Sequence, residues 1–155
     1  MRKTIEACYS LLERAGNAMQ SPFLLLVRLY WGWQFAETGW GKLHHLDTVT
    51  TFFTNLGIPL PGFNAPFVSA LEFVGGILLA LGLGSRVIAL LLAGDMLVAY
   101  LTKDRDALFS VFSDPNTFTG ATPYAYLFAS LLILIFGPGK LALDALFGKR
   151  APGAS

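Results

Sequence analysis

Four ionisable side chains interrupt the apolar stretches of this sequence, namely Arg28, Glu37, Glu72 and Asp95. In apolar surroundings such groups can hold a proton or bind the polar end of a ligand. Inside a bilayer each costs at least about 2.5–3.5 kcal/mol, so it faces the bundle interior or a cavity and marks a candidate functional site. The chemistry of the chain is therefore expected at these positions.

Two polar layers follow from their depths, at about 1.5 Å per helical residue. Arg28 and Asp95 lie roughly 9 and 13 Å from the same end of their segments and are predicted to form a structural ion pair. Glu72 lies roughly 10 Å from the opposite end, where no cationic residue shares its depth. It is then protonated, paired with Lys42 or Arg28, or facing a ligand.

The second layer is the candidate ligand site. Its candidate residues, from the first, second and fourth apolar segments, are Glu72, Gln34, Glu37, Tyr126 and Trp31. The alternative is that these groups only satisfy one another and fix helix register. Aromatic residues in such segments more often pack than contact a cofactor, so Trp31 has the weaker claim.

Four apolar segments must position these residues, at about 22–40, 65–83, 87–101 and 121–137. The chain is 54% hydrophobic and only 14% charged, against about 25% charged in soluble proteins. Segments of this length match the roughly 20 residues that cross a bilayer as a helix. We expect one all-α domain over residues 1–155, an integral membrane four-helix bundle. A soluble helical protein would need charged outer faces that these segments lack.

The flanking segments are expected to be amphipathic. Residues 1–20 carry one apolar seam and are predicted to form a separate interfacial helix on the membrane, or else a soluble helix docked on the bundle, before Ser21-Pro22 starts the first span. Short amphipathic segments are expected in the loops 41–64 and 103–120, and residues 140–155 form a basic tail. The seam of residues 1–20 consists of Ile5, Cys8, Leu12, Ala15 and Met19.

The second segment has a stripe of small residues, Gly76, Ala80 and Gly84, continued upstream by Glu72. Residues four apart share a helix face, and small residues let a second helix approach closely in lipid. The stripe can serve contacts within the chain or between copies, so the oligomeric state stays open. Gly82, Gly84 and Ser85 form a tight turn into Arg86, which predicts an antiparallel hairpin with the third segment.

Lysine and arginine counts predict the orientation. Four spans leave seven of these residues on one side and three on the other, so by the positive-inside rule both termini are cytoplasmic, in a membrane expected to be the bacterial inner membrane. The two groups are Arg2, Lys3, Arg14, Arg86, Lys140, Lys149 and Arg150 against Lys42, Lys103 and Arg105.

Several classes of function are disfavoured. A single cysteine excludes an intrachain disulfide and a Cys-x-x-Cys redox pair. The net charge of +1 does not favour nucleic-acid binding. His44 and His45 are adjacent and expected in a loop, which disfavours a metal site or a haem. No nucleotide-binding or metalloprotease motif is present, so no intrinsic cofactor and no metal are expected.

The ordered motifs resemble the DoxX family of small membrane proteins. They are Arg28 in the first span, FAETGWGKL at 35–43, FxxLGIP at 53–59 and LEFVGGILLALGLGSR at 71–86, and the resemblance extends from about residue 23 to 137. It implies a four-helix membrane bundle. The family takes its name from subunits of an archaeal quinol oxidase and of thiosulfate:quinone oxidoreductase. Its matched polar positions are Arg28, Glu37, Lys42, Glu72 and Arg86.

Three functions are weighed. The resemblance and the second polar layer suggest a redox-associated subunit that binds a quinone between helices, with Glu72, Gln34 or Tyr126 at the quinone oxygens, working with a soluble or membrane redox partner. The absence of a redox centre in the sequence favours a non-enzymatic protein that binds or transports a lipid or apolar solute. The third is a scaffold that anchors soluble partners through its ends. Whether the protein is an enzyme is left open.

Overall fold

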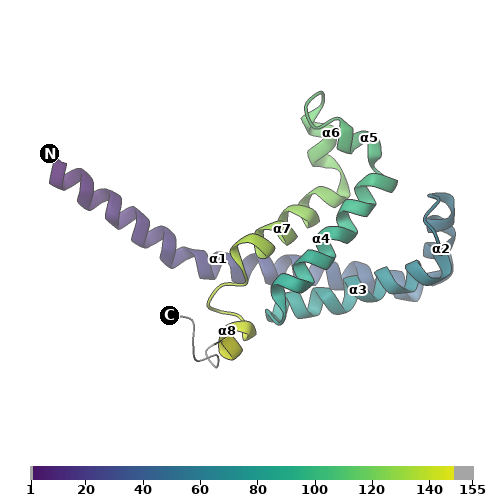
Figure 1. Ribbon diagram of the computed structural model, residues 1–155, viewed down its shortest axis with the longest axis horizontal. Coiled ribbons are helices and arrows are strands. Elements are labelled where there is room, and N and C mark those ends of the chain that lie inside the picture. Colours follow the sequence, from purple (N-terminus) through teal and green to yellow (C-terminus); the bar gives the residue numbers. More distant parts are fainter. Residues whose placement is uncertain (1, 149–155) are drawn as a thin grey trace.

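A computed structural model describes residues 2–148 of the chain and the side chains of residues 9–146. Within this part every regular element is a helix, as predicted (Figure 1). The helices are α1 (Arg2–His44), α2 (Leu46–Asn55), α3 (Pro61–Leu81), α4 (Ser85–Thr102), α5 (Arg105–Phe109), α6 (Pro115–Gly120), α7 (Thr122–Phe136) and α8 (Leu143–Gly148).

The four long helices contact one another in a ring, in which α1 packs on α3, α3 on α4, α4 on α7, and α7 on α1. The closest associations are α1 with α3 and α4 with α7. These two pairs meet near the α3–α4 turn and diverge away from it (Figure 1). All four helices contribute to the buried core, through Phe35, Leu79, Leu92 and Ile133 among others.

Two of the described helices, α3 and α4, are long and apolar enough to cross a membrane. Only 33% of each apolar window is buried inside the protein. Many of the other large side chains, such as Val74 on α3 and Leu90 on α4, are exposed. Water-soluble monomers rarely expose such continuous apolar surface, so these faces fit a lipid environment. Helix α7 is equally apolar but has only 15 residues.

Helix α1 runs without interruption from Arg2 to His44, so the predicted separation of residues 1–20 from the first span at Ser21-Pro22 is wrong. Pro22 lies inside the helix and removes one backbone donor without ending it. The Ser21 hydroxyl accepts a hydrogen bond from the Lys140 amide at 3.1 Å. The N-terminal part of α1 projects away from the other helices (Figure 1). The side chain of Cys8 lies outside the described residues.

The small-residue stripe of α3 packs within the chain, against α1. A Cβ atom added at Gly76 would lie 2.5 Å from both Ala36 N and Gly32 O, and one at Gly32 would lie 2.7 Å from Gly76 O. The two backbones are therefore in direct contact, as expected for small residues in lipid. Gly84 is not part of this contact, contrary to the prediction, because it has φ 61° and precedes α4 in the turn.

The predicted hairpin is present, and a distant residue completes it. Gly82 ends α3 with φ 75°, and Gly84 precedes α4, both left-handed conformations that glycine adopts without steric cost. The carboxylate of Asp144 accepts hydrogen bonds from the Gly84 amide at 2.7 Å and the Ser85 amide at 2.8 Å. Its own amide donates to Gly82 O at 2.9 Å. Asp144 thus caps α4 from about 60 residues away in sequence.

The segment that carries Asp144 is packed rather than free. Ala142 is 6% exposed and lies against Gly82, and the Lys140 amide is bound by Ser21. Residues 140–146 of the predicted basic tail are therefore docked on the end of the bundle, and 149–155 lie outside the described part.

Replacing Asp144 by alanine is expected to lower the free energy of unfolding by about 1 kcal/mol near pH 6, the usual effect of losing a helix cap. Partial desolvation favours the neutral carboxyl, but the Ser85 and Gly84 amides and the Arg28 charge outweigh it and hold the pKa of Asp144 below its ordinary value of 3.8. Because the folded-state pKa is depressed, this stabilisation is present above pH 3.8 and disappears as the pH falls through the folded-state pKa.

Thermal unfolding in detergent at pH 6 and pH 3 measures this effect. The difference between wild type and Asp144→Ala should be present at pH 6 and shrink at pH 3, whereas the exposed Asp106→Ala serves as control. A difference that does not change with pH would contradict the capping role.

Candidate functional site

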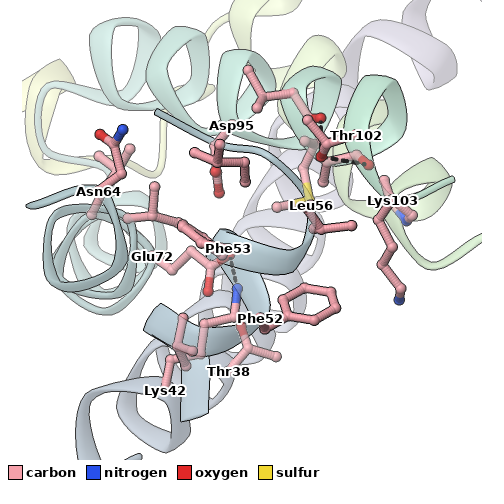
Figure 2. A pocket seen from close by; sticks show the side chains of 18 of the residues that line it. Thr38, Lys42, Phe52, Phe53, Leu56, Asn64, Glu72, Asp95, Thr102 and Lys103 are labelled. Atoms are coloured by element: carbon pink, nitrogen blue, oxygen red, sulfur yellow. Dashed lines mark hydrogen bonds and ion pairs between the residues drawn. The ribbon is translucent and has the colours of Figure 1, made fainter. Parts of the chain in front are cut away.

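A cavity of about 780 Å³ lies between the diverging helix pairs, on the side away from the α3–α4 turn (Figure 2). Its walls come from α1, α2, α3, α4 and α7 and are mostly apolar. The volume is within the range of small-molecule sites in proteins. The apolar wall includes Val49, Phe53, Leu56, Phe67, Leu71, Met96, Ala99 and Pro123.

One ion pair crosses this wall, between α1 and α3. The Lys42 ammonium donates to Glu72 Oε1 at 2.6 Å (Figure 2). The Glu72 side chain is 2% exposed and that of Lys42 is 36% exposed, so the pair connects the buried wall to the cavity mouth. Of the alternatives for Glu72, the structure shows pairing with Lys42. The second carboxylate oxygen of Glu72, Oε2, is buried and has no hydrogen-bond donor among the described residues.

Asp95 enters the same cavity from the opposite wall, on α4 (Figure 2). Its charge interacts with those of Glu72 and Lys42. Asp95 Oδ2 is also buried and unpartnered, as is Oδ2 of Asp104 where the cavity meets the end of α4. The structure therefore places two intramembrane carboxyls in one site.

The predicted ion pair between Arg28 and Asp95 is absent. Arg28 is fully buried, donates from Nη2 to Leu141 O at 2.7 Å, and lies against Gly82 at the α3–α4 turn. The long arginine side chain extends toward its own end of the helix, where a carbonyl and the charge of Asp144 are available. Asp95 is directed the other way. Arg28 therefore holds the C-terminal segment and has no place in the cavity.

The other candidate residues are divided between different surroundings. Tyr126 lines the cavity, and its ring contacts Phe35 at 4.8 Å and Trp31 at 5.0 Å between centroids. Trp31 thus supports Tyr126 without lining the cavity. Gln34 does not line it either. Glu37 is exposed and lies in a separate, smaller groove on the outer side of the α1–α3 pair.

Helix α2 provides one wall of the cavity, which the sequence predicted only in part. The predicted short amphipathic helix in the first loop exists, and its apolar side, with Val49, Phe53 and Leu56, covers the cavity mouth. The apolar spacing in residues 46–56 was the available signal. Asp95 was not predicted for this site. Its position in the sequence fits an ion pair near one end of the bundle as well as it fits a cavity near the other end.

The arrangement can enclose an apolar or amphipathic molecule and present it with carboxylates and one ammonium. No group of three or more metal-binding side chains occurs in the part of the chain that the structure describes. His44 and His45 are exposed, and each places Nδ1 2.9 Å from a backbone carbonyl oxygen four residues earlier. The ionisable side chains that line the cavity are carboxyls, lysine ammonium groups and the Tyr126 hydroxyl.

Apolar helices packed around a partly open polar cluster are consistent with a membrane protein, and comparison with known proteins defines its family. The chain matches the DoxX family model over residues 23–105. The chain therefore belongs to the DoxX family and is a membrane protein. No solved structure matches it.

Three curated relatives match most of the chain. "Inner membrane protein YqjF" of Escherichia coli (strain K12) is 30% identical over 82% of this chain and 93% of its own length. "Putative oxidoreductase CatD" of Bacillus subtilis (strain 168) is 30% identical over 77% and 83%. "Uncharacterized membrane protein Rv3486" of Mycobacterium tuberculosis (strain H37Rv) is 36% identical over 87% of both chains.

Proposed function

We propose that this protein binds an apolar or amphipathic small molecule within the membrane, in the cavity between the α1–α3 and α4–α7 pairs. The observation that carries the proposal is the cavity of about 780 Å³ with Lys42, Glu72 and Asp95 in a mostly apolar wall. A buried carboxylate that serves only packing is costly and is better replaced by an apolar residue. Two such groups facing one cavity favour a binding role.

The binding role assumes a four-span arrangement, with α1 from about residue 22, α3, α4 and α7 crossing the bilayer. The ring of contacts among these helices and their exposed apolar side chains support it. Helix α7, at roughly 22 Å, is short for a span of about 30 Å, and flanking polar residues can extend it by snorkelling. Both termini are then cytoplasmic, in keeping with the lysine and arginine distribution.

A cavity-filling substitution tests the proposal. The full chain is purified in a mild nonionic detergent, and retained lipids or apolar solutes are identified by native mass spectrometry. Ala99→Trp should remove the retained molecule, because residue 99 lines the cavity. Leu90→Trp on the same helix is the control, since Leu90 is 57% exposed and outside the cavity lining. Equal retention in both variants would contradict the proposal.

A redox role with a quinone as the ligand is the second candidate, and the name "Putative oxidoreductase" of the relative CatD favours only its redox part. Lys42 and Tyr126 on the cavity wall could each donate a hydrogen bond to a quinone carbonyl. The electrons would have to come from a partner protein. In vesicles, decylubiquinone should quench tryptophan emission saturably, because Trp31 contacts Tyr126. Quenching that rises with quinone content and never saturates would exclude a specific site.

A further inference from the structure

The unpartnered polar atoms of the cavity wall are all of one kind. Among the described residues that line it, three buried side-chain atoms lack a hydrogen-bond partner: Glu72 Oε2, Asp95 Oδ2 and Asp104 Oδ2. Each is a carboxylate oxygen and, when ionised, only accepts hydrogen bonds. Buried polar atoms in native proteins are nearly always paired. Glu72 and Asp95 can hydrogen-bond to each other only when one of them holds a proton. When both are ionised, their free oxygens need donors from whatever occupies the cavity.

The wall itself supplies few free donors. Thr38 and Thr102 donate to carbonyls of their own helices, and Asn64 donates to Pro59 O at 2.6 Å. The Lys42 ammonium is engaged by the other oxygen of Glu72, which leaves the Tyr126 hydroxyl as a further donor on this wall. The polar end of the cavity wall therefore has more free hydrogen-bond acceptors than free donors.

The formal charge of the cavity lining is negative, in keeping with the excess of acceptors. The charged side chains of the lining are three acids, Glu72, Asp95 and Asp104, and two bases, Lys42 and Lys103. Lys103 is exposed and points away from Glu72 and Asp95 (Figure 2). With every group ionised, the lining is one unit negative. A neutral acceptor such as a quinone carbonyl leaves both the charge and the three oxygens unmet.

We infer that the ligand is an amphiphile whose polar end is a cationic hydrogen-bond donor of the alkylammonium type, held by Asp95 and Glu72 with its apolar chain along the cavity wall. An ammonium offers three donors and one positive charge. Charge-assisted hydrogen bonds to carboxylates are roughly twice as strong as neutral ones. The inference rests on the proposed function, because it names the ligand class for the same cavity.

Three probes with the same chain and different polar ends test the inference. The full chain in nonionic detergent at pH 7 is titrated with dodecylamine, 1-dodecanol and dodecanoate, and bound probe is counted by native mass spectrometry. Dodecylamine should bind about tenfold more tightly than dodecanol, with dodecanoate weakest. Asp95→Asn should remove most of this preference, whereas Asp106→Asn, which alters an exposed acid outside the cavity, should retain it.

The outcomes separate the inference from the proposed function. If dodecanol or dodecanoate binds wild type as tightly as dodecylamine, the cavity binds amphiphiles but its carboxylates do not select the polar end, and the inference is overturned while the function stands. An unchanged preference in Asp95→Asn would likewise overturn it. If no probe binds, the cavity is not an amphiphile site and both fail. The wild-type ranking decides the matter even if the variant does not fold.

Discussion

Gly76→Ala is expected to lower the free energy of unfolding by about 3 kcal/mol and to reduce the yield of folded protein. The added methyl group would lie 2.5 Å from Ala36 N and Gly32 O and 2.9 Å from Phe35 Cβ. Two of these neighbours are backbone atoms, which cannot rotate away, so α1 and α3 must separate. Overpacking of this kind typically costs 1–3 kcal/mol, and backbone contact places this site at the upper end.

A glycine elsewhere in the bundle provides the control. Gly94 on α4 has nothing within 4 Å of an added Cβ, so Gly94→Ala should change stability by less than about 1 kcal/mol, the helix-propensity difference. Unfolding titrations with sodium dodecyl sulfate, followed by circular dichroism, compare the two variants. Equal stability of both would show that α1 and α3 do not approach as closely as described.

Lys42→Met is the second large expected effect, with a loss of about 2–3 kcal/mol. Removing one partner of a buried ion pair leaves the other charge without compensation, which typically costs 3–5 kcal/mol. The lower value applies here because the Lys42 side chain is 36% exposed. A second substitution, Glu72→Gln, removes the uncompensated charge, so the double variant should recover most of the loss.

The same denaturant titration, applied to the wild type, both single variants and the double variant, gives the coupling energy between the two positions. Lys103→Met is the matched control, because Lys103 is exposed and forms no ion pair among the described residues. Additive losses in the double variant, without recovery, would mean that the contact between Lys42 and Glu72 contributes no net stabilisation.

Much of the helix layout was predictable because apolar length and small-residue spacing are local properties of the sequence. The segments predicted at 65–83, 87–101 and 121–137 correspond to α3, α4 and α7 within a few residues. The inward direction of Glu72 also followed from its position on the same face as Gly76. Burial of the glutamate confirms this part of the prediction.

The partners of Arg28 and Asp95 were not predictable, because the depth of a residue along a helix does not fix the direction in which its side chain extends. Arg28 and Asp95 were placed at similar depths, yet their side chains extend toward opposite ends of the bundle. The partner of Arg28 is a backbone carbonyl at Leu141, and any residue type can supply one. The divergence of the two helix pairs, which creates the cavity, likewise has no signature in apolar periodicity.

The capping of α4 by Asp144 sets an order of events during biosynthesis. The α3–α4 hairpin leaves the ribosome well before residue 144 is translated, so the amides of Gly84 and Ser85 lack their carboxylate during insertion. Since chains fold from the N-terminus as they emerge, this end of the hairpin is completed last. A nascent chain arrested before residue 144 should therefore be open there to proteases that the finished protein resists.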